Sequence, residues 1–155
     1  MRFGYLIPAL LAGALTLSGC GGEAPKPAEP AAPAKPAPTV AELPAPYNEA
    51  DVAAGKSLFG RKCASCHYIQ ASKGNLVGPN LHGLFERGTA KAPNYNYSPA
   101  LKNFEHKEWK PELIDQWLIA PQGFVPGTAM FFNGLKEPIE RRDLIAYLLI
   151  ASREN

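Results

Sequence analysis

The 155-residue sequence has no marked excess of charge of either sign, since sixteen Lys and Arg stand against fourteen Asp and Glu. A protein that binds nucleic acid in bulk needs a strongly basic surface, so that class is not indicated. The sequence also lacks a membrane-spanning run, which takes about 20 apolar residues. No stretch alternates as a strand does. Cysteine and methionine are scarce, at three and two residues.

The first 19 residues predict a secretory signal peptide, with Arg2 as the positive start and an apolar run from Phe3 to Leu17. The cleavage site Leu17-Ser18-Gly19-Cys20 resembles the bacterial lipoprotein box, in which the cysteine becomes the acylated first residue. An ordinary secretory signal with a cysteine near its cut is the alternative. We expect Cys20 to carry lipid and to anchor the protein to a membrane of a bacterial cell envelope, with its folded part in the periplasm.

Residues 20–48 follow as a predicted tether. The stretch from Gly21 to Pro46 is dominated by Pro and Ala, and its only large apolar residues are Val40 and Leu43. Such a segment buries too little surface to fold, and its prolines favour an extended chain. We therefore predict a flexible spacer over 20–48 and one folded domain over 49–155.

Within that domain the sequence predicts helices at 50–59, 111–119 and 138–152, and therefore an all-α fold. Asn48 is the predicted N-cap of the first helix. Residues 140–143 are expected to keep the start of the last helix in water. Glycine and proline punctuate residues 68–97 too often for a regular element. So long a loop in a small domain indicates that a large prosthetic group organises the centre.

Cys63-Ala64-Ser65-Cys66-His67 is a C-x-x-C-H run, the attachment pattern for c-type haem. Both thiols would bond the haem, and His67 would then reach the iron. The alternatives are a redox dithiol, a zinc site completed by His82 or His106, and a disulfide. If Cys20 carries lipid and Cys63 and Cys66 bind haem, all three cysteines of the sequence have a role.

The ligand on the other face of the iron separates an electron carrier from a ligand-binding or catalytic site. Met130 is the only methionine after residue 1. Pro126 and Gly127 precede it and predict a turn that could aim its sulfur inward. His82 and His106 are its rivals, and we expect His82 on the surface.

The sequence resembles the class I cytochromes c, the family of mitochondrial cytochrome c and its soluble bacterial relatives. The likeness runs from about Gly55 to Leu148. Its motifs are Gly55-Lys56, Phe59, Cys63 to His67, Gly78 to Phe85, Tyr97-Ser98, Trp109, Pro126-Gly127-Thr128 with Met130, and Asp143 to Leu148.

The resemblance implies an all-α fold of a few helices and long loops around one covalent haem c, held through Cys63 and Cys66. It implies that the first and last helices cross where Gly55 and Phe59 meet Leu144 and Tyr147. His67 and Met130 would ligate the iron, and the Pro79 carbonyl would accept the other imidazole hydrogen. The residues implied to bind or enclose the haem propionates are Arg87, Tyr97, Trp109 and Thr128.

The function expected from this resemblance is single-electron transfer without enzymatic catalysis. The expected partners are membrane redox complexes: a quinol-oxidising cytochrome complex as donor, and a terminal oxidase or a photosynthetic reaction centre as acceptor. We expect a monomer, anchored to the bilayer through Cys20. A dedicated subunit of one complex is the alternative to a mobile carrier.

Overall fold

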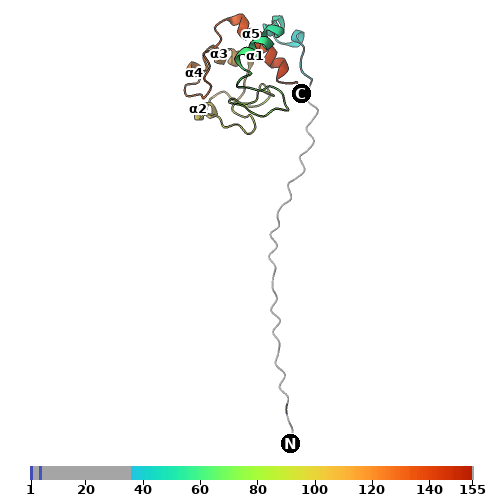
Figure 1. Cartoon of the computed structure of the whole chain (residues 1–155), viewed down its shortest axis with the longest axis vertical. Coiled ribbons are helices and arrows are strands. Elements are labelled where there is room, and N and C mark those ends of the chain that lie inside the picture. The colour runs from blue at the N-terminus through green and yellow to red at the C-terminus, as the bar shows by residue number, and fades with distance from the viewer. Residues whose placement is uncertain (2–3, 5–35, 155) are drawn as a thin grey trace. The chain divides into compact units, whose positions relative to one another are not determined.

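The computed structural model describes residues 36–154 together with Met1 and Gly4. Three helices carry most of the fold: α1 (Val52–Lys62), α3 (Pro111–Ile119) and α5 (Pro138–Ala151) (Figure 1). The short elements are η1 (Val40–Glu42), η2 (Tyr47–Glu49), α2 (Pro99–Lys102) and α4 (Pro121–Phe124). The only β-pairing among residues 36–154 is an isolated bridge between Gly88 and Glu108. The predicted all-α class is confirmed.

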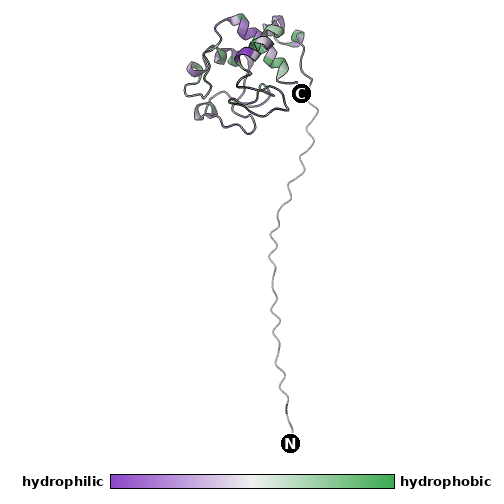
Figure 2. Cartoon of the chain, viewed as in Figure 1, coloured by the Kyte–Doolittle hydropathy of each residue, from purple (hydrophilic) through white to green (hydrophobic). Residues whose placement is uncertain are grey.

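Figure 2 shows both apolar and polar residues along α1, α3 and α5. Their apolar residues meet in one core, in which Leu144, Ile145 and Ala146 of α5 are fully buried. Within the described part of the chain, none of the helices is both long and apolar enough to cross a bilayer.

The start of α1 differs from the prediction. Asp51, rather than Asn48, is its N-cap, and one Asp51 carboxylate oxygen accepts a hydrogen bond from Ala54 N at 2.9 Å. Both residue types suit this position because a short oxygen-bearing side chain satisfies a free N–H of the first turn. Asn48 instead lies within η2.

The predicted crossing of the first and last helices is confirmed. A Cβ at Gly55 would lie 2.0 Å from the carbonyl oxygen of Asp143, so only glycine lets the two backbones approach this closely. One turn further, the rings of Phe59 and Tyr147 pack with their centroids 5.5 Å apart. The end of α1, where the C-x-x-C-H run begins, is thereby fixed against the most buried helix.

The expectation that residues 140–143 lie in water holds only in part, because Glu140 is exposed but Arg141 and Asp143 are buried. Arg141 donates to an Asp115 carboxylate oxygen at 2.7 Å and to the carbonyls of Leu135 and Lys136. Asp143 accepts from Arg142 and, at 3.1 Å, from Asp51 N. Charged groups can be buried when they are paired and hydrogen-bonded in this way.

The predicted flexible spacer over 20–48 extends too far along the chain. Residues 36–48 are ordered, and the Leu43 and Tyr47 side chains are buried in the core. A capping box between Thr39 and Glu42 shapes η1 before this docking. Two large apolar side chains were enough to attach a proline-rich stretch whose composition alone indicated disorder. The remainder of the predicted spacer, with Cys20 and the signal peptide, lies outside the described residues.

Residues 68–97 contain no helix or strand, as predicted. The Asn80 side chain organises part of this loop, since its Nδ2 donates to the carbonyls of Gln70, Lys73 and Gly74 at 2.7 to 3.2 Å. Asn75 links two parts of the same loop, because its side chain donates to Pro93 O at 2.9 Å. The chain therefore supplies some of the order that we had assigned to a prosthetic group alone.

Candidate functional site

A central cavity of about 370 Å³ lies between the long helices and the loops. It is mostly apolar, with walls that include Phe59 from α1 and Leu144 from α5. All nine residues predicted for the site line it: Cys63, Cys66, His67, Pro79, Arg87, Tyr97, Trp109, Thr128 and Met130. The structure thus brings together residues that are up to 67 positions apart in the sequence.

The two cysteines lie where α1 ends. Cys63 is the C-cap of α1, its N–H donates to Phe59 O, and Cys66 N donates back to Cys63 O at 2.9 Å. Both cysteines are free, so the disulfide alternative is wrong for this structure. Burial, and secondarily the neighbouring Cys66, raises the pKa of the Cys63 thiol to about 11. Two free thiols therefore face the cavity from one turn of chain.

The His67 imidazole is held in one orientation. Its Nδ1 lies 2.7 Å from the carbonyl oxygen of Pro79, as the resemblance implied. Gly78 lies against the ring, where a Cβ would be 2.2 Å from Cε1. Burial and then the charge of Arg87 lower the pKa of His67, outweighing the Pro79 bond that raises it. A neutral ring with Nδ1 bound to a carbonyl leaves Nε2 as the electron-pair donor.

Met130 enters the cavity from a different part of the chain. Pro121 ends α3 and also begins α4, so the predicted stop is followed by one more helical turn. After α4, Thr128 N donates to Val125 O, and Thr128 Oγ1 accepts from Met130 N at 3.4 Å. This turn presents the half-buried Met130 side chain to the same cavity as His67.

The remaining predicted pocket residues also hold defined positions. Arg87 donates to the carbonyls of Asn80 and His82, so its guanidinium is fixed beside the cavity. The Tyr97 hydroxyl accepts from Ala92 N at 3.2 Å, and burial raises the pKa of this phenol. Trp109 packs on Trp117 with ring centroids 5.4 Å apart. The pocket therefore offers the positive charge of Arg87 and a polar hydroxyl in an aromatic wall.

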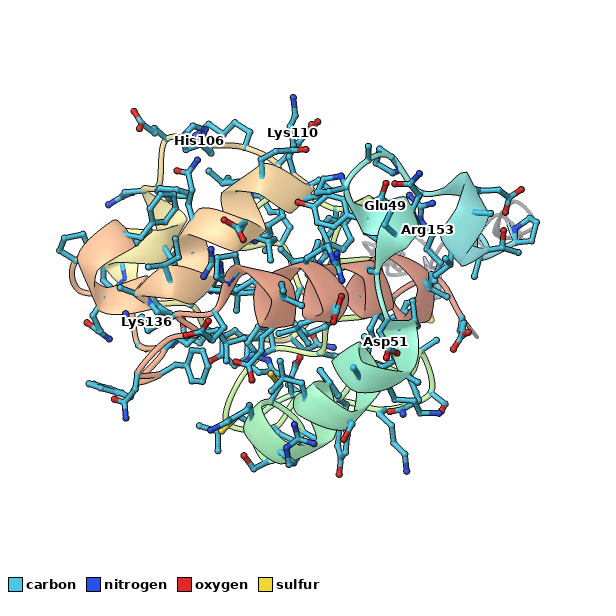
Figure 3. All side chains as sticks on the ribbon, turned by 90° about the horizontal axis from the view of Figure 1, so that it is seen from above. Glu49, Asp51, His106, Lys110, Lys136 and Arg153 are labelled. Atoms are coloured by element: carbon cyan, nitrogen blue, oxygen red, sulfur yellow. The ribbon has the colours of Figure 1, made fainter. Side chains whose placement is uncertain are left out.

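The two rival histidines are not among the residues that line the cavity. His106 is exposed, and Figure 3 shows it at the edge of the molecule, away from α1. His82 is half-buried rather than on the surface as expected, with its Nδ1 enclosed and unpaired. Over residues 36–154, no three His, Cys, Asp or Glu side chains come together as a metal cluster, which is against the zinc alternative.

The cavity opens to solvent at an apolar rim. Phe131 and Val77 both line it, and they are 90% and 78% exposed. Exposed apolar side chains grouped at the mouth of a site are unusual on a free surface and typical of contact surfaces. Sequence reasoning missed this rim because exposure depends on how two distant loops meet.

A c-type haem fits the cavity. The volume lies within the range of about 300 to 1,000 Å³ found for ligand pockets. Apolar walls suit the macrocycle, the two thiols suit its vinyl groups, and Arg87 suits its carboxylates. The set of a neutral imidazole and a thioether is the one typical of electron-transfer haem iron.

Sequence reasoning also missed two amide side chains. Asn80, within the motif Gly78 to Phe85, shapes the loop that carries Pro79 and received no role. Gln122 was not among the predicted site residues, yet its side chain donates to the carbonyls of Thr128 and Met130. The sequence does not indicate which backbone carbonyl the side chain of such a polar residue will contact.

Comparison with known proteins agrees with this site. The family model described as cytochrome c matches residues 52–152. A cytochrome c of Arabidopsis thaliana is 43% identical over 100 residues, which is 64% of this chain and 88% of the relative. A cytochrome c of Ginkgo biloba is 41% identical over 104 residues, covering 67% and 91%. The chain therefore belongs to the cytochrome c family, as a class I member and an electron carrier with one haem c bound through Cys63 and Cys66.

Proposed function

We propose that this protein is a membrane-tethered carrier that moves single electrons between membrane redox complexes, and that His67 and Met130 are the residues that would bind its haem iron. The observation that carries the proposal is the meeting of an oriented His67 imidazole and the Met130 side chain in one apolar cavity beside two free thiols. The haem, when bound, supplies an iron that changes valence by one electron.

The residues of the chain support this chemistry by keeping the side chains that would bind the iron in fixed orientations. Pro79 O and Gly78 fix the His67 ring, and the turn at Thr128 fixes Met130. Arg87 would balance the charges of the haem propionates, and Tyr97, Trp109 and Thr128 would enclose them. An apolar pocket and a methionine ligand both favour the reduced iron, so we expect a positive potential.

The donor that we propose is a quinol-oxidising cytochrome complex, and the acceptor is a terminal oxidase or a photosynthetic reaction centre. The rim of Val77 and Phe131 supports direct docking over the cavity mouth. Thirteen Lys and Arg face twelve Asp and Glu over residues 36–154, so long-range attraction is weak. A tether offsets this weakness because it raises the effective concentration of the domain near the membrane.

The anchor that we propose is the acylated Cys20, exposed after cleavage of residues 1–19, with the haem domain in the periplasm. The position of η2 supports it, because Glu49 of η2 lies away from the Met130 loop. Figure 3 shows Glu49 and Arg153 at one end of α5, and Lys136, which follows the Met130 loop, at the other.

The coordination is tested by absorption spectra of the purified oxidised protein. Methionine on ferric haem gives a weak far-red charge-transfer band, which we expect in the wild type and expect to vanish in Met130→Ala. A wild type without the band, with high-spin iron that binds carbon monoxide readily, would refute the closed carrier and indicate an open reactive site.

The anchor is tested separately by fractionating bacterial cells that express the full chain or Cys20→Ser. We expect the wild type in the membrane fraction with incorporated radiolabelled palmitate, and the variant without label. Ala24→Ser, a nearby change outside the cleavage box, is the control. Equal labelling of Cys20→Ser and the wild type would disprove attachment at Cys20.

A further inference from the structure

The stretch that carries Met130 makes few hydrogen bonds through its own backbone. Thr128 N donates to Val125 O at 3.0 Å, and the next backbone-to-backbone bond along the chain runs from Leu135 N to Leu118 O at 2.8 Å. Within the described part of the chain, residues 129–134 make none. Side chains must therefore supply the hydrogen bonds that fix the Met130 backbone.

Gln122 supplies two of them. Its Nε2 lies 2.8 Å from the carbonyl oxygen of Thr128 and 3.1 Å from that of Met130. A primary amide carries two hydrogens on this nitrogen, one for each carbonyl. The other hydrogen bond in this stretch is the one at 3.4 Å from Met130 N to Thr128 Oγ1. Of the three, the two shorter ones belong to Gln122.

The amide is attached to a fixed support. Gln122 is the second residue of α4, and the neighbouring Pro121 is fully buried in the core. The far end of the loop is fixed as well, because Lys136 Nζ donates to Ile119 O at 2.6 Å, next to the Leu135 bond. The Met130 loop is thus fixed at both ends, and Gln122 binds it between these ends, at Met130 itself.

We propose that Gln122 is a positioning residue that keeps the Met130 loop closed against competing iron ligands. The inference rests on the proposed ligation by Met130. A foreign ligand binds only when the Met130 sulfur has left, so its apparent affinity rises with the population of the open loop. Removing two hydrogen bonds to the closed loop increases that population, while the iron site itself is unchanged.

The test is a titration of the oxidised holoprotein with imidazole, followed by loss of the far-red band. The variants are Gln122→Ala, which removes the amide, and Gln122→Glu, which keeps its length but has no donor at neutral pH. We expect both to bind imidazole about fivefold more tightly than the wild type, the factor for roughly one net hydrogen bond. Gln116→Ala is the matched control, because Gln116 is an exposed residue of α3 whose side chain makes no hydrogen bond within the described chain.

Wild-type affinity in both Gln122 variants would overturn the proposal. So would an effect of Gln122→Ala that Gln122→Glu does not share, since the cause would then be packing rather than the donor. An equal effect of Gln116→Ala would overturn it too, as a general loosening of the fold. If the wild type has no far-red band, ligation by Met130 itself fails, and that outcome is distinguishable before any variant is measured.

Discussion

Gly78 shows at the scale of one residue how the chain prepares the His67 ring. A Cβ at this position would lie 2.2 Å from Cε1 and 2.8 Å from Nε2 of the imidazole. The ring cannot move aside without losing its bond to Pro79 O. The absence of a side chain at Gly78 is therefore a condition for the ring orientation that the iron needs.

We predict that Gly78→Ala lowers the free energy of unfolding of the holoprotein by about 1 to 3 kcal/mol, the usual cost of overpacking a filled site. Guanidinium titration followed at the haem absorption band measures it. Gly74→Ala is the control, since nothing lies within 4 Å of its added Cβ. Equal stability of the two variants would contradict the close contact.

At the scale of elements, the docked segment of residues 36–50 is the least expected part of the fold. It precedes the family match, which begins at residue 52, yet Leu43 and Tyr47 belong to the core. The segment joins η1 and η2 to α5 and ends at the N-cap of α1. We infer that it stabilises the crossing of α1 and α5 from outside the residues that the family model matches.

Leu43→Ala should therefore lower the free energy of unfolding by about 2 to 5 kcal/mol, as for other buried leucines. Urea titration monitored by far-ultraviolet circular dichroism measures this. Pro44→Ala, at the exposed neighbouring position, should change it little. If Leu43→Ala is as stable as Pro44→Ala, the segment is a passive spacer.

Because of Tyr47, we expect the stability of this segment to change with pH in the alkaline range. Burial, and then the charges of Glu112 and Asp115, raise the pKa of the Tyr47 phenol from 10.0 to about 12. The unfolded chain loses this proton first, so the stabilisation is complete below pH 10 and is lost as pH rises from 10 to 12. Tyr47→Phe keeps the ring but removes the ionisable group.

We expect the loss of stability between pH 9 and pH 11 to be smaller in Tyr47→Phe than in the wild type, in urea titrations at each pH. Tyr68→Phe, outside the segment, is the comparison variant. A wild-type pH dependence in Tyr47→Phe would show that the phenol reaches water in the folded protein.

For the whole molecule, the balance of charge sets how the domain meets its partners. Residues 36–154 carry one more positive than negative charge. Steering of strongly charged proteins changes association rates by about 10- to 1,000-fold. We predict less than about a tenfold change in the rate of reduction by an isolated quinol-oxidising complex between 10 and 200 mM salt, measured by stopped flow. A steeper dependence would show a charged patch at the mouth.

Much of the site could be predicted from the sequence because covalent chemistry depends on local order. The run from Cys63 to His67 places two thiols and an imidazole within five residues whatever the fold does around them. Met130, the only methionine after residue 1, was predicted for the same site, and its side chain lines the cavity. Helices at 111–119 and 138–152 followed from apolar spacing and from proline in their first turns.

Other features were decided by tertiary structure because they depend on what a side chain meets. In the sequence, Arg141 and Asp143 look like surface residues. In the fold, Arg141 pairs with Asp115 of α3, and Asp143 accepts from the backbone N–H of Asp51. Leu43 and Tyr47 lie in a stretch whose average composition predicts disorder. They are buried only because the folded core accommodates their side chains. Gln122 acquires its role because α4 and the Met130 loop fold back on each other. The sequence by itself determined the chemistry of the site, whereas the tertiary structure decided how firmly it is held and which parts remain exposed.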